Sequence, residues 1–166
     1  QFKDCIRNMI AFDPSSLDHL VNYQTTPDEE PAINQFGKGD KYFGICTLLA
    51  TMPGLPMFGH GQFEGFRERY GMDFSNPQIN ENPDEELIMR HRKEITPLLN
   101  NRNYFSQSAN FAMLDFLGIE NSINDNIITF FNQNNGIKSL VAFNNSNYPV
   151  KGSIQIPIKM NGKTKI

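Results

Sequence analysis

The sequence lacks tryptophan, has only 2 cysteines in 166 residues, and shows no excess of basic charge. Its 15 Lys and Arg are scattered and are outnumbered by 18 Asp and Glu, for a formal net charge of -3. We therefore expect neutral or polar small molecules as partners, with no nucleic acid and no membrane. No apolar run approaches the roughly 18 residues of a membrane span, and no leader pattern opens the chain.

The two cysteines show no spacing typical of a metal site. Cys5 and Cys46 each lie in an apolar helical pattern, without a CxxC motif or a nearby histidine. We expect buried free thiols rather than a disulfide or a metal site, and we expect no metal and no cofactor.

The length limits what the chain can contain. The 166 residues suffice for one ordinary domain or a small domain with part of a second, whereas an eight-stranded α/β barrel typically needs about 250. Hydrophobic residues make up 39% of the chain, enough for a packed core. Because Gln1 leads directly into a helical pattern, we expect a segment of a longer protein.

A βαβ unit is predicted in the first sixty residues. Residues 19–23 and the apolar run 55–58 are typical of strands, the second of them buried on both faces. Between them, Asp40 is positioned to cap an apolar helix that ends at Pro53-Gly54. Such strands are parallel, and ligands collect at their carboxyl ends, which here are 24–39 and 59–80.

Two further helices are predicted around this unit. Apolar spacing gives an amphipathic helix at 2–10, and a second helix starts at Asn82-Pro83 with Pro83 at its first position. The inner face of the second helix comprises Leu87, His91, Ile95 and Leu98.

The period changes from helical to alternating after Asn103. Residues 127–131 and 137–143 predict a hairpin whose turn contains Asn135-Gly136, and 153–159 predict a strand that Pro157 places at a sheet edge. We therefore expect an α/β part at 1–103 and an antiparallel β domain at 104–166.

Acidic residues gather at both predicted carboxyl ends: Asp28, Glu29 and Glu30 after the first strand, and Glu64, Glu68 and Asp73 after the second. Two carboxylates on adjacent loops can flank a glycosidic bond, although solvated loop charges or helix caps explain them equally simply. His60, between two glycines, could bind a sugar hydroxyl, transfer a proton or satisfy loop carbonyls. The rings of Phe63, Phe66, Tyr70 and Phe74 could stack on a sugar or pack the loop.

Several runs resemble glycoside hydrolase family 13, the α-amylase superfamily. VNYQTTPDE at 21–29 resembles the family's seventh-strand motif V-N-F-L-E-N-H-D-E, and GLPMFGHGQ at 54–62 resembles its eighth strand with G-x-P and G-Q-E. RHRKEITPLL at 90–99 is similar to its eighth helix, and 127–150 to the first hairpin of its β-sandwich. The resemblance implies the C-terminal end of a (β/α)8 TIM barrel, strands seven and eight with their helices, followed by an antiparallel β-sandwich.

The resemblance also implies a function. Asp28 matches the carboxylate that stabilises the transition state of a retaining glycoside hydrolase or transglycosidase acting on α-glucans or maltooligosaccharides. Substrate-binding positions would be Gln24, Glu29, His60, Gln62 and Glu64. The nucleophile and the acid/base belong to strands that this chain does not contain, so the rest of the barrel is the expected partner.

Two departures from the family pattern leave alternatives open. Pro27 stands where the family has His, and Phe63 stands where it has Glu, with Glu64 one place later. A non-catalytic carbohydrate-binding or regulatory protein on the same fold is one alternative. A small autonomous enzyme using Asp28 and Glu64 as its pair is another.

Overall fold

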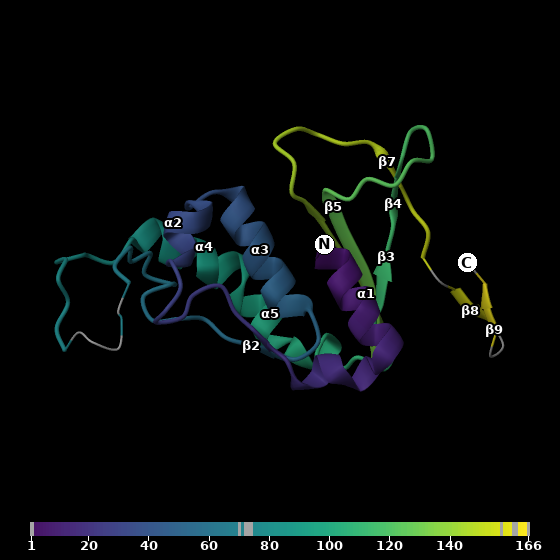
Figure 1. Cartoon of the computed structure of the whole chain (residues 1–166), viewed down its shortest axis with the longest axis horizontal. Helices are drawn as coiled ribbons and strands as arrows, with labels where there is room; N and C mark the ends of the chain where they lie inside the picture. The colour runs from purple at the N-terminus through teal and green to yellow at the C-terminus, as the bar shows by residue number, and fades with distance from the viewer. Residues whose placement is uncertain (1, 70, 72–74, 157, 161–162, 166) are drawn as a thin grey trace. The chain divides into compact units, whose positions relative to one another are not determined.

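The computed structural model describes residues 2–69, 71, 75–156, 158–160 and 163–165, with side chains as far as residue 156 (Figure 1). Two compact units share the chain. One combines Gln1–Asp18 with Asn103–Ile166, and the other comprises His19–Arg102. The boundary between Arg102 and Asn103 falls where a boundary was expected, near Asn103. The expected segment 1–103 is nevertheless not one unit, because its first 18 residues pack with the C-terminal strands.

Ion pairs hold the first helix in that unit. α1 (Phe2–Phe12) buries Lys3 and Ile6. The Lys3 ammonium lies 3.0 Å from the carboxylate of Asp125, and Arg7 lies 2.7 Å from that of Asp115. A buried ammonium needs such a partner, which is why this helix stays with the β unit, whose connections between strands supply both acids.

The expected burial of both cysteines is wrong for Cys5. Both thiols are free, and Cys46 is fully buried, but Cys5 is exposed on α1. Phe2, from the same predicted apolar face, is 44% exposed. The helix turns a stripe around Lys3 and Ile6 inward, so its buried face is rotated away from the one that hydrophobicity alone indicates.

The predicted parallel strand pair is confirmed in the unit 19–102. After η1 (Pro14–His19), β1 (Val21–Asn22) pairs with β2 (Leu55–Pro56) in parallel, Val21 opposite Leu55. Both strands are shorter than predicted, although the hydrogen bonds Leu55 N to Leu20 O and Met57 N to Asn22 O, each 2.8 Å, extend the pairing at either end.

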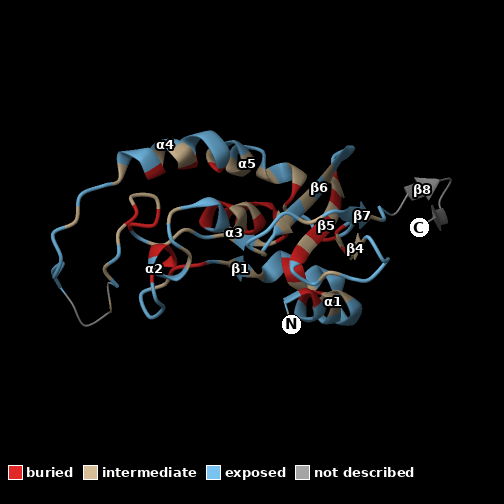
Figure 2. Cartoon of the chain, turned by 90° about the horizontal axis from the view of Figure 1, so that it is seen from above, coloured by how far each residue is buried: buried red, intermediate tan, exposed pale blue. Residues whose placement is uncertain are grey.

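The crossover between these strands contains two helices. α2 (Ala32–Phe36) lies in the polar stretch where no helix was predicted, and α3 (Asp40–Thr51) matches the predicted apolar helix. Buried residues follow most of α3 (Figure 2). The predicted cap is wrong: Gly39 is the cap residue, and the Asp40 carboxylate instead accepts from Arg90 Nη2 at 2.6 Å.

The second predicted helix starts later than expected and is broken. α4 (Glu85–Glu94) is capped by Asp84, whose Oδ1 accepts from Leu87 N at 3.0 Å, so Pro83 is outside the helix. α5 (Thr96–Asn100) follows, with Pro97 in its first turn. The predicted inner face is confirmed, because Leu87, His91 and Ile95 are buried and Leu98 packs against them. The core of this unit comprises Ala32, Ile33, Tyr42, Phe43, Cys46, Ala50, Leu87 and Ile95.

One face of the parallel pair is uncovered, contrary to the expectation that residues 55–58 are buried on both sides. Alternate residues of the two strands are exposed: Val21 46%, Tyr23 51%, Leu55 62% and Met57 37%. The intervening Asn22 and Pro56 are only partly exposed. The side chains of a strand alternate between faces, so the four exposed apolar residues share one face.

The predicted antiparallel strands are confirmed in the other unit. After η2 (Arg102–Tyr104), β3 (Ala112–Leu114), β5 (Ile127–Asn134) and β6 (Ile137–Asn144) form one sheet in the order β3-β5-β6. The β5–β6 turn places Asn135 and Gly136 at φ of 51° and 78°, which is the conformation that an Asn-Gly turn favours.

Two smaller antiparallel pairs complete this unit. β4 (Phe116–Gly118) pairs with β7 (Gly152–Ile154), and β8 (Ile158–Met160) pairs with β9 (Lys163–Lys165). The predicted single strand 153–159 is therefore two separate strands. Pro157, between them, lies outside the described residues.

Candidate active site

The loop after β1 holds Asp28 at its exposed tip. Thr25 Oγ1 accepts from Ala32 N at 3.0 Å and closes the loop at its base. Thr26 Oγ1 accepts from Glu29 N at 3.2 Å and shapes the turn that contains Asp28. Asp28 and Glu29 are both exposed, so the loop presents its acidic residues outward from a buried base.

The loop after β2 lies directly against this base. A Cβ placed on Gly59 would be 2.7 Å from Thr25 Cβ, Cγ2 and O, closer than real contacts allow. His60 is exposed next to it, with its ring centroid 6.3 Å from that of Phe66. Glycine at position 59 is therefore required by the close approach of the two loops at the carboxyl ends of the strands.

Two predicted site residues, Gln24 and Gln62, meet in the interior. Gln62 Nε2 donates to Gln24 Oε1 at 2.6 Å, and Gln62 Oε1 accepts from Gly59 N at 3.1 Å. Gln24 is 9% exposed and Gln62 is 2% exposed. The structure thus places these two amides inside the protein, where they join the loops.

Sequence reasoning missed a polar cluster beneath the two amides. The Tyr42 hydroxyl lies 3.2 Å from the carbonyl of Gln62 and 2.8 Å from His91 Nε2, and Cys46 Sγ donates to Gln24 Oε1 at 3.5 Å. Burial raises the pKa of Tyr42 above its usual range and raises that of Cys46 to about 12, so both stay protonated at neutral pH. Tyr42 and Cys46 are four residues apart on one face of α3, a spacing that could have signalled the cluster.

His91 is enclosed by aromatic rings. Its ring centroid lies 4.2 Å from that of Phe63, 5.0 Å from Phe43, 5.5 Å from Tyr42 and 6.2 Å from Phe58. Burial lowers the pKa of His91 to about 4, so the imidazole is neutral at pH 7. Tyr42 has one hydroxyl proton, and donating it to the Gln62 carbonyl leaves Tyr42 Oη to accept from His91 Nε2–H. The predicted position of His91 near the core is confirmed.

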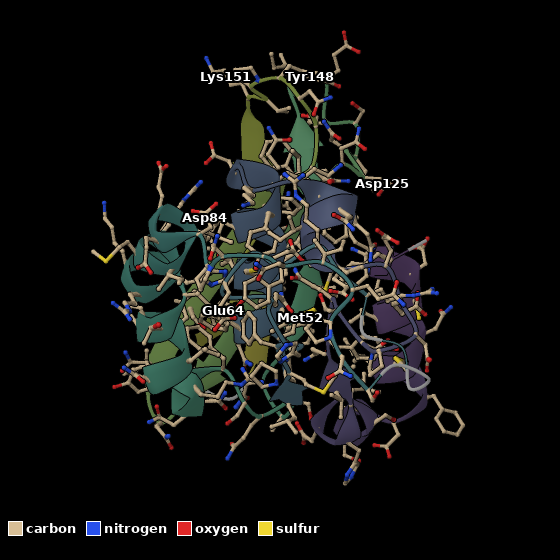
Figure 3. The ribbon with its side chains drawn as sticks, turned by 90° about the vertical axis from the view of Figure 1, so that its left-hand side faces the viewer. Met52, Glu64, Asp84, Asp125, Tyr148 and Lys151 are labelled. Atoms are coloured by element: carbon tan, nitrogen blue, oxygen red, sulfur yellow. The ribbon has the colours of Figure 1, made fainter. Side chains whose placement is uncertain are left out.

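Phe63, at the position where the resembled motif has Glu, lies against His91. The half-buried Phe63 ring packs against the buried imidazole of His91, and the neighbouring Glu64 is also half-buried. The Glu64 carbonyl accepts from Asp84 N at 2.9 Å, which ties the loop to the start of α4 (Figure 3 labels both residues). The Phe63 ring thus faces His91, while the Glu64 backbone joins the loop to α4.

The remaining described loop acids accept hydrogen bonds from neighbouring loop groups. Glu68 accepts from the amides of Gln78 and Ile79 at 2.6 and 2.9 Å, and Glu81 accepts from those of Arg67 and Glu68 at 2.9 Å. These reciprocal bonds close the base of an excursion of the chain after β2. Glu30 accepts from Asn34 Nδ2 at 2.5 Å. Asp73, Tyr70 and Phe74 lie outside the described residues.

Asp28 has one described partner across the loops. Its backbone carbonyl accepts from Arg69 Nη1 at 3.4 Å. Among the described residues, no hydrogen bond joins Asp28 to Glu64, the pair of the autonomous-enzyme alternative. The sequence-predicted residues thus divide into the buried pair Gln24 and Gln62, the exposed group Asp28, Glu29 and His60, and half-buried Glu64.

A separate pocket of about 260 Å³ opens at the start of α4 and is lined by Lys38, Asp84, Glu86, Leu87 and Arg90. The Lys38 ammonium lies 2.5 Å from Asp84, and Arg90 pairs with Asp40 and Glu94. None of the predicted sugar-binding residues lines this pocket. Its two cations are already neutralised by protein carboxylates.

Comparisons with protein-family models, curated proteins and solved structures find no significant match to this chain. In the described part of the chain, no three His, Cys, Asp or Glu residues are grouped as metal ligands. No helix of the described residues is long and apolar enough to cross a membrane.

Proposed function

We propose that this chain is the C-terminal part of an α-amylase-like retaining glycoside hydrolase or transglycosidase that acts on α-glucans. The observation that carries the proposal is the position of Asp28, exposed at the carboxyl end of a strand in a parallel βαβ arrangement. In such folds the catalytic groups lie on the loops that follow the strands. The resemblance of residues 21–29 and 54–62 to family motifs assigns these strands to positions seven and eight.

The uncovered apolar face of β1 and β2 supports the barrel. Parallel sheets are covered on both faces, and Val21, Tyr23, Leu55 and Met57 leave one face of this pair in solvent. In a barrel, these side chains point into the interior, where layers of branched and aromatic residues fill the centre. The other strands of the barrel, which in this proposal carry the nucleophile and the acid/base, would cover them.

The proposed role of Asp28 is electrostatic. Its carboxylate would stabilise the positive charge that develops on the sugar ring while the nucleophile on another strand displaces the leaving group. A loop closed at its base holds the charge in place before the reaction, so no reorganisation is required during it. Glu29 and His60, exposed beside it, would bind sugar hydroxyls, and Glu64 would lie at the edge of the site.

The test is the Asp28→Asn substitution in the full-length polypeptide that carries this chain. With a maltooligosaccharide substrate, turnover is expected to fall about 100- to 1,000-fold, the usual effect of removing one preorganised stabilising group. The exposed Glu120, substituted to Gln, serves as the control and keeps full turnover. Unchanged turnover in Asp28→Asn would reject the role, and binding of maltooligosaccharide without any turnover in the parent would favour the non-catalytic alternative.

A further inference from the structure

We infer that Gln24 and Gln62 are positioning residues for Asp28, forming a buried strut that fixes its loop against the loop after β2. The inference rests on the proposed function, because it assigns the two amides to that site. It also removes them from substrate binding, the role that the family resemblance implies. Gln62 uses both ends of its amide, and Gln24 Oε1 accepts two hydrogen bonds, whereas the buried Gln24 Nε2 has no partner among the described residues. Exposed fractions of 9% and 2% leave little surface on either side chain for a sugar.

Both ends of the Gln62 amide are used in the strut. Nε2 donates across to Gln24 Oε1 at 2.6 Å, and Oε1 accepts from Gly59 N at 3.1 Å within its own loop. Two donors, Gln62 Nε2 and Cys46 Sγ, converge on Gln24 Oε1, and this convergence sets the orientation of the Gln24 amide. The bond pattern therefore fixes which end of each amide faces the other.

The strut is connected to Asp28 through Thr25. Thr25 follows Gln24 in the chain, is buried, and holds the far end of the loop through its bond from Ala32 N. Gly59 packs on Thr25 from the other loop, at a distance that leaves no room for a methyl group. Hydrogen bonds on one side and steric contact on the other thus fix the base of the loop. The fixed base in turn determines the position of the exposed Asp28.

Position matters because a transition-state contact is sensitive to small displacements. A misplacement of about 1 Å can cost about 100-fold in rate even when the altered residue is far from the reaction. Loss of the strut should therefore reduce kcat, whereas KM, set by all the sugar contacts together, should change little.

The experiment compares Gln62→Leu, Gln24→Met and the double variant in the full-length polypeptide, with maltoheptaose as substrate. We expect each single variant to lower kcat about 10- to 100-fold with KM within about two-fold. The double variant is expected to lose no more than the worse single one, because the two residues act as one unit. Independent, multiplying losses would overturn the strut.

Gly59→Ala is the second variant, since it displaces Thr25 without leaving a buried amide unsatisfied. It is expected to lower kcat in the same way, and it decides the question if Gln62→Leu does not fold. Thr51→Val is the matched control, because it changes a buried side chain and removes one part-buried hydrogen bond within α3, from Thr51 Oγ1 to Thr47 O, away from both loops. Equal kcat in folded Gly59→Ala, Gln62→Leu and Thr51→Val would refute the inference.

A measurement without substrate separates this inference from the proposed function. Hydrogen exchange at the amide of Ala32 is expected to be at least about tenfold faster in Gln62→Leu than in Thr51→Val, because the loop base loosens. If the full-length polypeptide turns over no α-glucan but exchange at Ala32 is still faster in Gln62→Leu, the proposed function is refuted and the strut is supported. Unchanged exchange would refute the strut.

Discussion

His91 makes the stability of the unit 19–102 depend on pH in a calculable way. Its pKa is lowered to about 4 in the folded chain, against an ordinary value near 6.5. Below pH 6.5 the unfolded chain binds a proton that the folded chain refuses, so stability is fully present above pH 6.5 and is lost as pH falls toward 4. Integrated from pH 7.5 to pH 5, the loss is about 2 kcal/mol.

The assay is urea unfolding followed by circular dichroism at both pH values. With a slope of about 2 kcal/mol per M, the wild-type midpoint should fall by about 1 M between pH 7.5 and 5. In His91→Gln, which has no titrating ring, the protein is less stable at pH 7.5 but the fall should largely disappear. His19→Gln, at an exposed histidine, should keep the wild-type fall. The same pH dependence in His91→Gln and wild type would refute the reasoning.

Two further predictions concern packing. Ile95→Ala, at a fully buried position between α4 and α5, should lower the free energy of unfolding by about 2–5 kcal/mol through the cavity it leaves. In the same urea-unfolding assay, Met89→Ala, at an exposed position on α4, should stay within about 0.5 kcal/mol of wild type. The chain produced alone should aggregate through its uncovered strand face, and Leu55→Ser with Met57→Ser should reduce that aggregation in light scattering. Light scattering of the double variant equal to that of wild type would show that another surface drives the aggregation.

Local signals in the sequence predicted the elements that local forces determine. The apolar helix at 40–51 and the Asn-Gly hairpin follow from periodicity or turn chemistry within short windows. The parallel pairing of 21–22 with 55–56 follows from the strand-helix-strand order of the segment. The inner face of α4 follows from its 3.6-residue period.

Features decided by distant partners were not predictable in this way. Asp40 does not cap α3 because its carboxylate accepts from Arg90, fifty residues away. Cys5 is exposed because the helix turns Lys3 inward toward Asp125, more than a hundred residues later. Pro83 stands outside α4 because Asp84 caps the helix, and Asp84 is held in that place by Lys38 and by the Glu64 carbonyl. Hydropathy weighs none of these pairings.

The sequence indicated the residues of the candidate site, but it did not indicate which of them are buried and which are exposed. Position at the two carboxyl ends indicated Asp28, Glu29, His60 and Glu64, and the family resemblance added Gln24 and Gln62. Which of them face solvent depends on Gly59 lying on Thr25 and on Tyr42 reaching the Gln62 carbonyl, contacts that no sequence spacing encodes.

The bare side of the β1–β2 ribbon has a consequence for biogenesis. In the proposed barrel, the strands that would cover this face are synthesised first. Their sheet would keep an unpaired edge until β1 and β2 are translated. Residues 19–58 would then close the barrel, and the nascent chain would depend on chaperones until these residues are translated. Mutations here would be read out as poor yield before any catalytic defect could be measured.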